Sequence, residues 1–222
     1  MSEIKVYVFD AYGTLFDFVT AARGCRDVLG DDADRLAKLW RDKQLQYTWL
    51  RTLQGHHADF WQVTSDALDF ALDTLGIKVD GLHSRLMNLY LELEAFPEVV
   101  GVLNSLRSSG LRLAILSNGS PRMLDAAVEA AGLARYFDAI LSIEELRVYK
   151  PHPKVYQLAV DQLGVPASAI MFVSSNAWDA YAASAFGMRV VWCNRYSQHR
   201  ERLPGSPDYE IDSLIELPRL AQ

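Results

Sequence analysis

Cysteine is scarce in this sequence, and long hydrophobic runs are missing. The two cysteines, Cys25 and Cys193, form no paired-cysteine motif, so we expect buried thiols in a reducing compartment rather than a disulfide framework. No apolar run approaches the roughly 20 residues of a membrane-spanning helix. Residues 1–5 lead into a strand-like segment instead of a signal peptide. The sequence therefore predicts a cytoplasmic protein.

Positive charge is also in deficit. Lys and Arg number 22 against 28 Asp and Glu, which gives a formal net charge of -6. Binding to a nucleic-acid backbone needs a basic stripe, and the sequence has none, which argues against nucleic acid and an anionic membrane surface as partners. The 5 histidines have no metal-ligand spacing with one another or with a cysteine, so no zinc motif is present.

The rest of the composition is that of an ordinary globular protein. Hydrophobic residues make up 50% and charged residues 23%, while 13 Gly and 8 Pro are too few for a disordered or fibrous chain. A chain of 222 residues buries roughly 70–75% of its unfolded surface, which is enough for a sizeable core. That length fits one domain, or one domain with an insertion.

The most informative stretch is the first predicted strand with its turn. Four apolar or aromatic residues, Val6 to Phe9, precede Asp10, and the chain then turns at Gly13. A strand buried on both faces would deliver the Asp10 carboxylate to its C-terminal end, where open α/β sheets bind ligands. In a dry site such a carboxylate is a usable nucleophile. An aspartate that only caps or turns the chain is the alternative, and this stretch alone favours it.

Hydrophobic periodicity divides the chain into two kinds of segment. Over residues 17–96 the apolar residues recur at helical spacing. Short apolar runs then alternate with helical stretches, as in βαβ units, and cover residues 111–116, 139–142, 169–173 and 189–193. We therefore predict an α/β fold with a Rossmann-like parallel sheet flanked by helices. Its core domain is discontinuous (1–16 and 97–222), and an all-helical cap domain (17–96) is inserted after the first strand.

Polar residues follow the later predicted strands. After the run 111–116 comes Ser117-Asn118-Gly119, and Ser120 with Pro121 fits a helix N-cap, so backbone N–H groups and a helix dipole would face an anion. An ordinary well-capped turn explains these residues equally well. Lys150 lies between two βα units at the same edge of the sheet. A single lysine is usually exposed to solvent, and only this placement makes it a candidate.

Further candidates follow the run 169–173 and lie in the helical segment. Asn176 and Asp179 match a capping-box spacing, which accounts for both, but the same geometry would aim Asp179 toward the first strand. Arg41 and Leu45 lie one turn apart, so a cation and an apolar side chain would point the same way. A surface arginine paired with a nearby acid is the alternative, and spacing alone favours it.

Together these motifs resemble the haloacid dehalogenase superfamily. In chain order they are Asp10-Ala11-Tyr12-Gly13-Thr14-Leu15, Ser117-Asn118-Gly119, Lys150-Pro151 and Ser174-Ser175-Asn176-Ala177-Trp178-Asp179. The stretch from Leu39 to Arg51 is similar to the cap helix of one subfamily, the (S)-2-haloacid dehalogenases. The resemblance covers cap and core. It implies hydrolysis of short (S)-2-haloacids to (R)-2-hydroxyacids, with a 2-haloalkanoic acid, water and halide as the small-molecule partners and a homodimer as the assembly.

Two positions separate the chain from the magnesium-dependent phosphatases that dominate that superfamily. Tyr12 stands where those enzymes carry a second aspartate that protonates the leaving group. Ser174 and Ser175 stand where a Gly-Asp pair supplies a metal ligand. Without these acids too little negative charge remains for a magnesium ion, and a halide leaving group needs no proton. We therefore expect neither a metal nor another cofactor.

The resemblance also implies a role for each motif residue. Asp10 would displace halide from C2 and form an ester, and Asp179 would ready the water that hydrolyses it. The residues expected to position or activate carboxylates are Thr14, Lys150, Tyr156, Ser174 and Asn176. The substrate carboxylate would be held by Ser117 and nearby backbone N–H groups. The residues expected to cradle the halide or line the cavity around C2 are Ala11, Tyr12, Arg41, Leu45, Phe60, Asn118 and Trp178.

Asp42 departs from the family pattern. It follows Arg41, and a buried carboxylate there would weaken the binding of an anionic substrate, so Asp42 has either to face away or to pair with a basic neighbour.

Two competing functions remain open on the sequence. One is a phosphatase or phosphonatase of the same superfamily, against which the missing aspartates count. The other is a non-catalytic binding protein on this fold, which would keep several buried charges at an energetic cost without using them.

Overall fold

A parallel sheet of six strands lies at the centre of the computed structural model, which describes residues 3–220. The strand order is β3-β2-β1-β4-β5-β6, so the direction of the strand order reverses beside β1. The strands are β1 (Val6–Phe9), β2 (Arg112–Ser117), β3 (Ala139–Ser142), β4 (Ile170–Ser174), β5 (Arg189–Cys193) and β6 (Tyr209–Ile211). Such a reversal leaves a crevice at the carboxyl ends of the strands, which is the usual ligand site of an open α/β sheet.

The predicted α/β class is confirmed, with small differences in the strands. The strands β2 and β4 begin and end one residue later than predicted. The edge strand β6 was not predicted, because it is short and two of its three residues are exposed, so it has no apolar run. By contrast β1 and β4 are buried throughout, which explains their continuous hydrophobic sequences.

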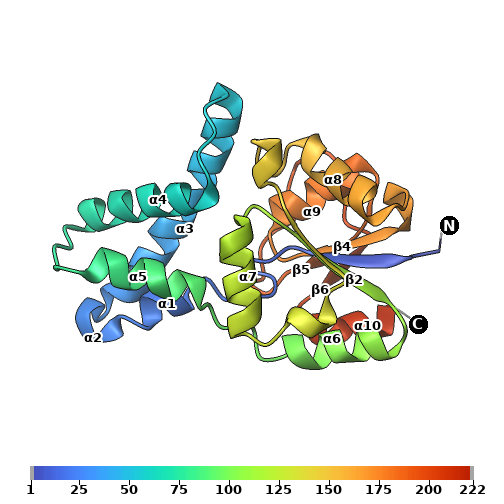
Figure 1. The fold of residues 1–222 in the computed structure, drawn as a ribbon, viewed down its shortest axis with the longest axis horizontal. Helices are drawn as coiled ribbons and strands as arrows, with labels where there is room; N and C mark the ends of the chain where they lie inside the picture. Colours follow the sequence, from blue (N-terminus) through green and yellow to red (C-terminus); the bar gives the residue numbers. More distant parts are fainter. Residues whose placement is uncertain (1–2, 221–222) are drawn as a thin grey trace.

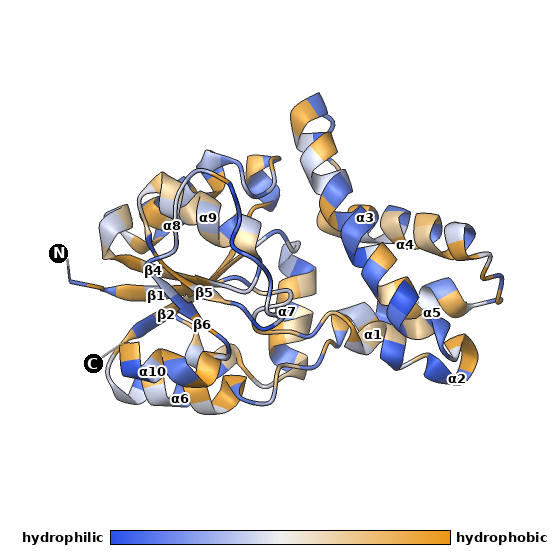
Figure 2. Cartoon of the chain, turned by 180° about the vertical axis from the view of Figure 1, so that it is seen from behind, coloured by the Kyte–Doolittle hydropathy of each residue, from blue (hydrophilic) through white to orange (hydrophobic). Residues whose placement is uncertain are grey.

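Helices cover both faces of the sheet (Figure 1). On one face lie α6 (Val99–Ser108), α7 (Pro121–Ala130) and α10 (Leu217–Leu220), and on the other α8 (Pro153–Leu163) and α9 (Ala177–Phe186). Short 3-10 helices complete this part of the chain: η1 (Ala134–Tyr136), η2 (Glu144–Leu146), η3 (Ala167–Ala169) and η4 (Leu214–Glu216). Figure 2 shows the hydrophobic strands enclosed between these helical layers.

The segment between β1 and α6 is helical, as predicted, and lies to one side of the sheet (Figure 1). It comprises α1 (Thr20–Arg23), α2 (Arg26–Leu29), α3 (Asp32–Gln54), α4 (Phe60–Leu75) and α5 (Leu82–Leu91). Helix α3 ends at Gly55, whose φ of 70° favours glycine. Helix α4 begins at Asp59, whose carboxylate accepts a hydrogen bond from the Gln62 N–H at 2.7 Å. We call residues 17–96 the insertion.

The two linkers of the insertion pair with each other. Phe16 and Ala95 form an antiparallel bridge, and the Phe96 N–H donates to the Leu15 carbonyl at 3.0 Å. The insertion therefore leaves and rejoins the sheet at one place. The division into a core domain (1–16 and 97–222) and a cap domain (17–96) stays a prediction, which this pairing supports.

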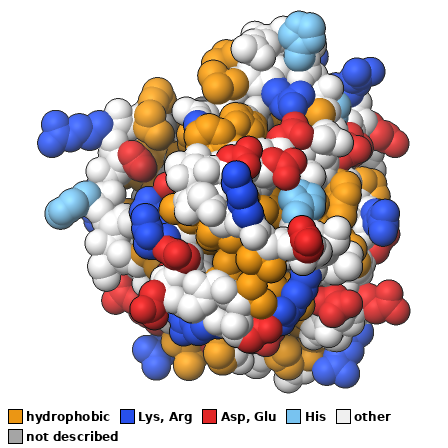
Figure 3. All heavy atoms as spheres, turned by 90° about the vertical axis from the view of Figure 1, so that its left-hand side faces the viewer, with side chains coloured by type: hydrophobic (Ala, Val, Ile, Leu, Met, Phe, Trp, Pro, Cys, Tyr) orange, Lys and Arg blue, Asp and Glu red, His pale blue; other side chains and the backbone are white. Residues whose placement is uncertain are grey.

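The surface in Figure 3 is of mixed charge, and the cysteines form no disulfide. In Figure 3, which faces the insertion helices, acidic and basic side chains are interspersed. Across residues 3–220, no helix is both long enough and apolar enough to cross a membrane. Cys25 and Cys193 are both buried, and neither is in a disulfide.

Candidate active site

The Asp10 carboxylate lies at the carboxyl end of β1, next to the point where the strand order reverses. It is 6% exposed. One oxygen, Oδ2, accepts hydrogen bonds from Asn176 Nδ2 at 2.7 Å, Thr14 Oγ1 at 3.2 Å and Ser174 Oγ at 3.4 Å. The other, Oδ1, accepts from Lys150 Nζ at 2.9 Å. These bonds hold the carboxylate in one orientation, so Asp10 is not merely a turn residue.

Lys150 is buried, contrary to the usual behaviour of a lysine. Its ammonium is 1% exposed and donates to Asp10 Oδ1 at 2.9 Å and to Asp179 Oδ2 at 2.7 Å. The Lys150 backbone N–H donates to Asn118 Oδ1 at 3.0 Å, which ties the loop to the end of β2. Burial by itself lowers the pKa of Lys150, but the two carboxylates outweigh burial and raise it. The lysine is therefore a fixed cation between two acids.

Asp179 is completely buried on the first turn of α9. Besides Lys150, its carboxylate accepts hydrogen bonds from Tyr156 Oη at 2.7 Å and Ser174 Oγ at 3.3 Å. Burial, reinforced by the nearby Asp10 charge and opposed by Lys150, raises the pKa of Asp179 to about 6. Burial beside Asp179 also holds the pKa of Tyr156 well above its usual value, so this phenol stays a donor.

The capping-box interpretation of Asn176 and Asp179 is wrong. Asn176 occupies the N-cap of α9, but its side chain makes no capping hydrogen bond. Instead its amide group donates to Asp10 Oδ2 at 2.7 Å and to the Tyr12 carbonyl at 3.1 Å. Both side chains form hydrogen bonds with residues distant in the sequence. The packing of β4 beside β1 brings these residues within hydrogen-bond distance.

A small cavity lies beside Asp10, between the sheet and the insertion. Its volume is about 10 Å³, so the side chains around it leave room for little more than one water molecule. Its lining residues are Asp10, Tyr12, Arg41, Leu45, Phe60, Ser117, Asn118, Lys150, Asn176 and Trp178. Residues expected from the sequence to act together thus meet here, although they come from β1, β2, α3, α4, α8 and α9 or the loops beside them.

Arg41 brings a cation to this cavity from α3. One guanidinium nitrogen donates to Gln44 Oε1 at 2.7 Å, and another approaches the Tyr12 carbonyl at 3.3 Å. Gln44 is buried, and its amide nitrogen donates a hydrogen bond to Thr64 Oγ1 at 2.7 Å. Asp42 lies outside this arrangement, because its exposed carboxylate pairs with Lys38 at 2.8 Å. Of the two options for Asp42, the basic neighbour is the one found.

Aromatic rings form one wall of the cavity. The Tyr12 ring stacks on Tyr90 at 5.5 Å and lies 5.6 Å from Phe60. Burial keeps the pKa of the Tyr12 phenol well above its usual value. A Cβ at Gly119 would come within 2.9 Å of the Tyr12 hydroxyl oxygen, so the ring requires glycine there. Ala11 is fully buried, and its carbonyl accepts the N–H of Leu15 at 2.9 Å in the turn.

Two serines lie at or after the end of β2 at this edge. Ser117 is the last residue of β2 and is fully buried, and its Oγ accepts the Gly119 N–H at 3.1 Å. Ser120 is the N-cap of α7, as the sequence predicted, but its side chain makes no capping hydrogen bond.

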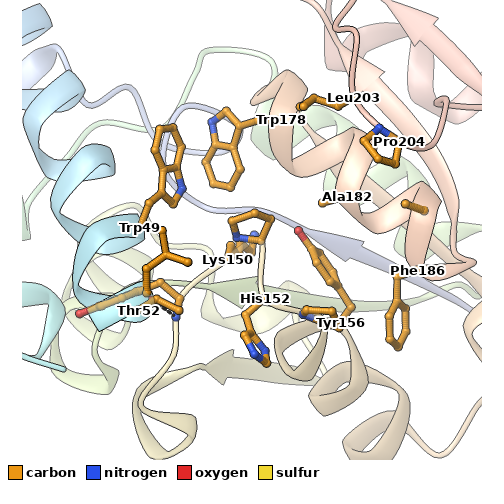
Figure 4. Close-up of a pocket in the computed structure, with 15 residues that line it drawn as sticks. Trp49, Thr52, Lys150, His152, Tyr156, Trp178, Ala182, Phe186, Leu203 and Pro204 are labelled. Atoms are coloured by element: carbon orange, nitrogen blue, oxygen red, sulfur yellow. Dashed lines mark hydrogen bonds between the residues drawn. The ribbon is translucent and has the colours of Figure 1, made fainter. Parts of the chain in front are cut away.

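Trp178 lines both the cavity and a larger apolar groove. Figure 4 shows the residues that line this groove. The Trp178 ring meets Trp49 of α3 edge-on at 5.4 Å. Beyond this pair the groove is lined by residues of α8 and α9, among them Tyr156 and Phe186.

Sequence reasoning gave no role to two residues that support the site. Gln44 contacts Arg41, and the Tyr90 ring stacks on Tyr12. The position of Gln44, three residues after Arg41 on a helix, is a signal for the first of them. Tyr90 depends on a tertiary contact, and no local pattern marks it.

The described residues contain no cluster of metal-ligating side chains. Across residues 3–220, no group of three or more His, Cys, Asp or Glu side chains has the geometry to hold a metal ion. At the position where superfamily phosphatases carry a metal-binding aspartate, the buried Ser175 hydroxyl has no hydrogen-bond partner.

Several known proteins with similar sequences and structures are named dehalogenases. A family model described as haloacid dehalogenase-like hydrolase matches residues 4–187. The (S)-2-haloacid dehalogenase 1 of Pseudomonas sp. (strain CBS-3) is 46% identical over 221 residues, covering 99% of this chain and 97% of the relative. The haloacetate dehalogenase H-2 of Moraxella sp. (strain B) is 39% identical, covering 98% and 99%. A solved structure of L-2-haloacid dehalogenase from Xanthobacter autotrophicus has chloropropionic acid covalently bound. It superposes on this chain with a TM-score of 0.91. The two sequences are 38% identical, and the match covers 98% of each chain.

Proposed function

The chain belongs to the haloacid dehalogenase-like hydrolases, and from this premise we propose that it hydrolyses short (S)-2-haloacids to (R)-2-hydroxyacids. The reaction passes through an ester on Asp10. The observation that carries the proposal is the pairing of Asp10 with one buried cation, Lys150, beside a small cavity that Arg41 also lines. Relatives that share this chain's full length are named (S)-2-haloacid or L-2-haloacid dehalogenases, and one is named a haloacetate dehalogenase.

In the first step the Asp10 carboxylate attacks C2 of the substrate. The halide leaves from the opposite side of C2, taking the bonding electron pair with it, and the carbon inverts. Thr14, Asn176, Ser174 and Lys150 hold the carboxylate in position, so little reorganisation is needed when it attacks. Water is largely excluded from this buried group, which increases its nucleophilicity.

Charge that develops on the halide is stabilised by one residue of the insertion and one residue that follows β2. Arg41 supplies the cation, and Asn118 supplies amide N–H groups, because its oxygen is already used by the Lys150 backbone. Phe60, Tyr12, Leu45 and Trp178 keep the cavity apolar around C2. The substrate carboxylate is held by Ser117 and the backbone N–H groups after β2, and Ala11 contributes the backbone beside it.

The second step hydrolyses the ester. Asp179 accepts a proton from water, which attacks the carbonyl carbon of the esterified Asp10 side chain and releases the hydroxyacid. A base with a pKa of about 6 is well matched to proton transfer near neutral pH. Tyr156 and Lys150 orient Asp179 through the hydrogen bonds described above.

Several finer features belong to this proposal. The insertion acts as a cap domain (17–96) over a core domain (1–16 and 97–222). The enzyme is a homodimer in the cytoplasm, it needs no cofactor, and it has no nucleic-acid or membrane partner. Size-exclusion chromatography with light scattering tests the dimer, and a monomer at working concentration contradicts it.

Halide release from (S)-2-chloropropionate, with and without a chelator, tests the function. We expect chloride release that is unchanged by the chelator, because Tyr12 and Ser175 replace the acids that magnesium would need. Activity that disappears with chelator and returns with magnesium would instead support the phosphatase alternative. Absence of halide release from every 2-haloacid would support a binding protein.

A further inference from the structure

Arg195 links the end of β5 to the turn that carries the catalytic machinery. Its side chain is only 9% exposed, and it forms an ion pair with Glu98 at the start of α6. A second guanidinium nitrogen donates to the Thr14 carbonyl at 3.0 Å. The guanidinium also lies 3.9 Å from the centre of the Phe96 ring. This arginine is buried and none of the motifs includes it.

Thr14 is the point at which this contact reaches Asp10. The Thr14 hydroxyl donates to Asp10 Oδ2 at 3.2 Å and accepts the Ser175 N–H at 2.8 Å. Its backbone N–H closes the turn on the Ala11 carbonyl at 3.2 Å. A displacement of the Thr14 carbonyl would therefore move a group that orients the nucleophile.

The other contacts of Arg195 lie where the insertion returns to the sheet. Phe96 belongs to the linker that pairs with Leu15, and Glu98, two residues later, is the N-cap of α6. Ser213 Oγ also approaches Glu98 at 3.4 Å, which fixes the carboxylate from the C-terminal segment. One guanidinium thus contacts the nucleophile turn and the returning linker at the same time.

We propose that Arg195 is a positioning residue for the dehalogenation reaction, acting on Asp10 through the Thr14 carbonyl. The inference rests on the proposed function. Glu98 and Phe96 hold the guanidinium in place, and the hydrogen bond to the carbonyl fixes the turn. Arg195 itself touches neither the cavity nor the reacting atoms.

Three variants separate this role from ordinary structural support. Arg195→Met removes the contact with Thr14. Glu98→Gln removes the charge partner but leaves the arginine able to reach that carbonyl. Arg107→Met is the matched control, because Arg107 likewise pairs with a carboxylate, Asp138 at 2.7 Å, and approaches a backbone carbonyl, Leu111 at 3.4 Å, away from the site.

We expect Arg195→Met to lower kcat about tenfold while KM for (S)-2-chloropropionate changes less than about twofold, since misplacement of the nucleophile slows chemistry without altering the groups that bind substrate. Glu98→Gln and Arg107→Met should keep kcat within about twofold of the parent enzyme. Should Arg195→Met not fold, the double variant Arg195→Met with Glu98→Gln, which leaves no unpaired buried carboxylate, takes its place. A kcat near the parent value in the arginine variant, or an equal fall in Glu98→Gln, overturns the proposal.

Hydrogen exchange gives a readout that does not depend on activity. Amide exchange in a peptide covering residues 13–17 should be faster in Arg195→Met than in the parent enzyme, and unchanged in Arg107→Met. If the parent enzyme released no halide, the proposed function would fail, while this exchange measurement would still test the contact. Unchanged exchange in the arginine variant would show that Arg195 does not fix the turn.

Discussion

The ammonium of Lys150 lies 2.7 Å from the carboxylate of Asp179, and neither side chain has appreciable contact with water, with exposures of 1% and 0%. Asp10 completes the group at 2.9 Å from the same nitrogen. Charges so close together influence one another's protonation, so the protonation of Asp179 depends on the charges of Lys150 and Asp10. This buried group determines the pH dependence and much of the local stability of the site.

The first prediction concerns pH. The pKa of Asp179 is raised to about 6, so the base is protonated below that value and cannot accept a proton from water. We expect kcat to rise roughly tenfold per pH unit up to pH about 6 and then to level off, where ester hydrolysis limits turnover. Steady-state rates of halide release from pH 5 to 8 measure this. A flat profile would exclude Asp179 as the base.

The same raised pKa has an opposite effect on stability. The folded carboxyl keeps its proton to higher pH than in the unfolded chain, where the value is 3.8. The contribution of Asp179 to stability is therefore present below pH about 4 and is lost as pH rises to about 6.

Asp179→Asn should trap the ester. The amide cannot accept a proton from water, so Asp10 is esterified but the product is released slowly, and kcat falls by roughly 10²–10⁴. Mass spectrometry of the peptide that contains Asp10, after incubation with (S)-2-chloropropionate, should show an added 1-carboxyethyl group, bound to the Asp10 carboxylate through C2 of the substrate. An unmodified Asp10 together with lost activity would place Asp179 in the first step instead.

Lys150→Met should be strongly destabilising, by about 3–5 kcal/mol at pH 8, because two buried carboxylates lose their cation. Without the cation the pKa of Asp179 rises further, because Lys150 opposes the effect of burial, so the folded state binds a proton more readily and the loss should be smaller at pH 5. Urea unfolding at the two pH values measures the difference. Lys38→Met is the control, because its pair with Asp42 is exposed and its removal should have little effect. An equal loss at both pH values would contradict this account.

Arg41→Ala should lower kcat by roughly 10²–10³, since it removes the cation that stabilises the departing halide. The free energy of unfolding should change little, because Gln44 keeps its other partners, Thr64 and Tyr90. Arg35→Ala on the same helix is the control, as Arg35 is 71% exposed and pairs only with Asp32. Normal turnover by Arg41→Ala would mean that the halide is stabilised by other groups.

The stereochemistry and the origin of the product oxygen test the ester mechanism. A single inversion at C2 converts an (S)-haloacid to the (R)-hydroxyacid. In one turnover in ¹⁸O-water with enzyme in excess, the label should enter Asp10 and leave the first product unlabelled, because water adds to the carboxyl carbon of Asp10. Label in the product with an unlabelled Asp10 would show that water attacks C2 directly. Retention at C2 would exclude both mechanisms.

The sequence by itself determined the fold class and most elements. Continuous apolar runs predict buried parallel strands, and amphipathic periodicity predicts helices, because both signals are local consequences of which faces are buried. The edge strand β6 escaped detection because two of its three residues are exposed. The polar residues that follow each strand could be named as candidates, since parallel strands end at one edge of the sheet.

Only the tertiary structure decided which of those candidates act together. Asn176 and Asp179 fit a capping box as well as a site, and the packing of β4 against β1 settled the choice by offering Asp10, Tyr12 and Lys150 as partners. Lys150 and Asp10 are 140 residues apart in the chain. Burial, pKa and charge pairing depend on such distant neighbours, which no local pattern encodes. For the same reason the contacts of Tyr90 with Tyr12 and of Arg195 with Thr14 became visible only when the chain was folded.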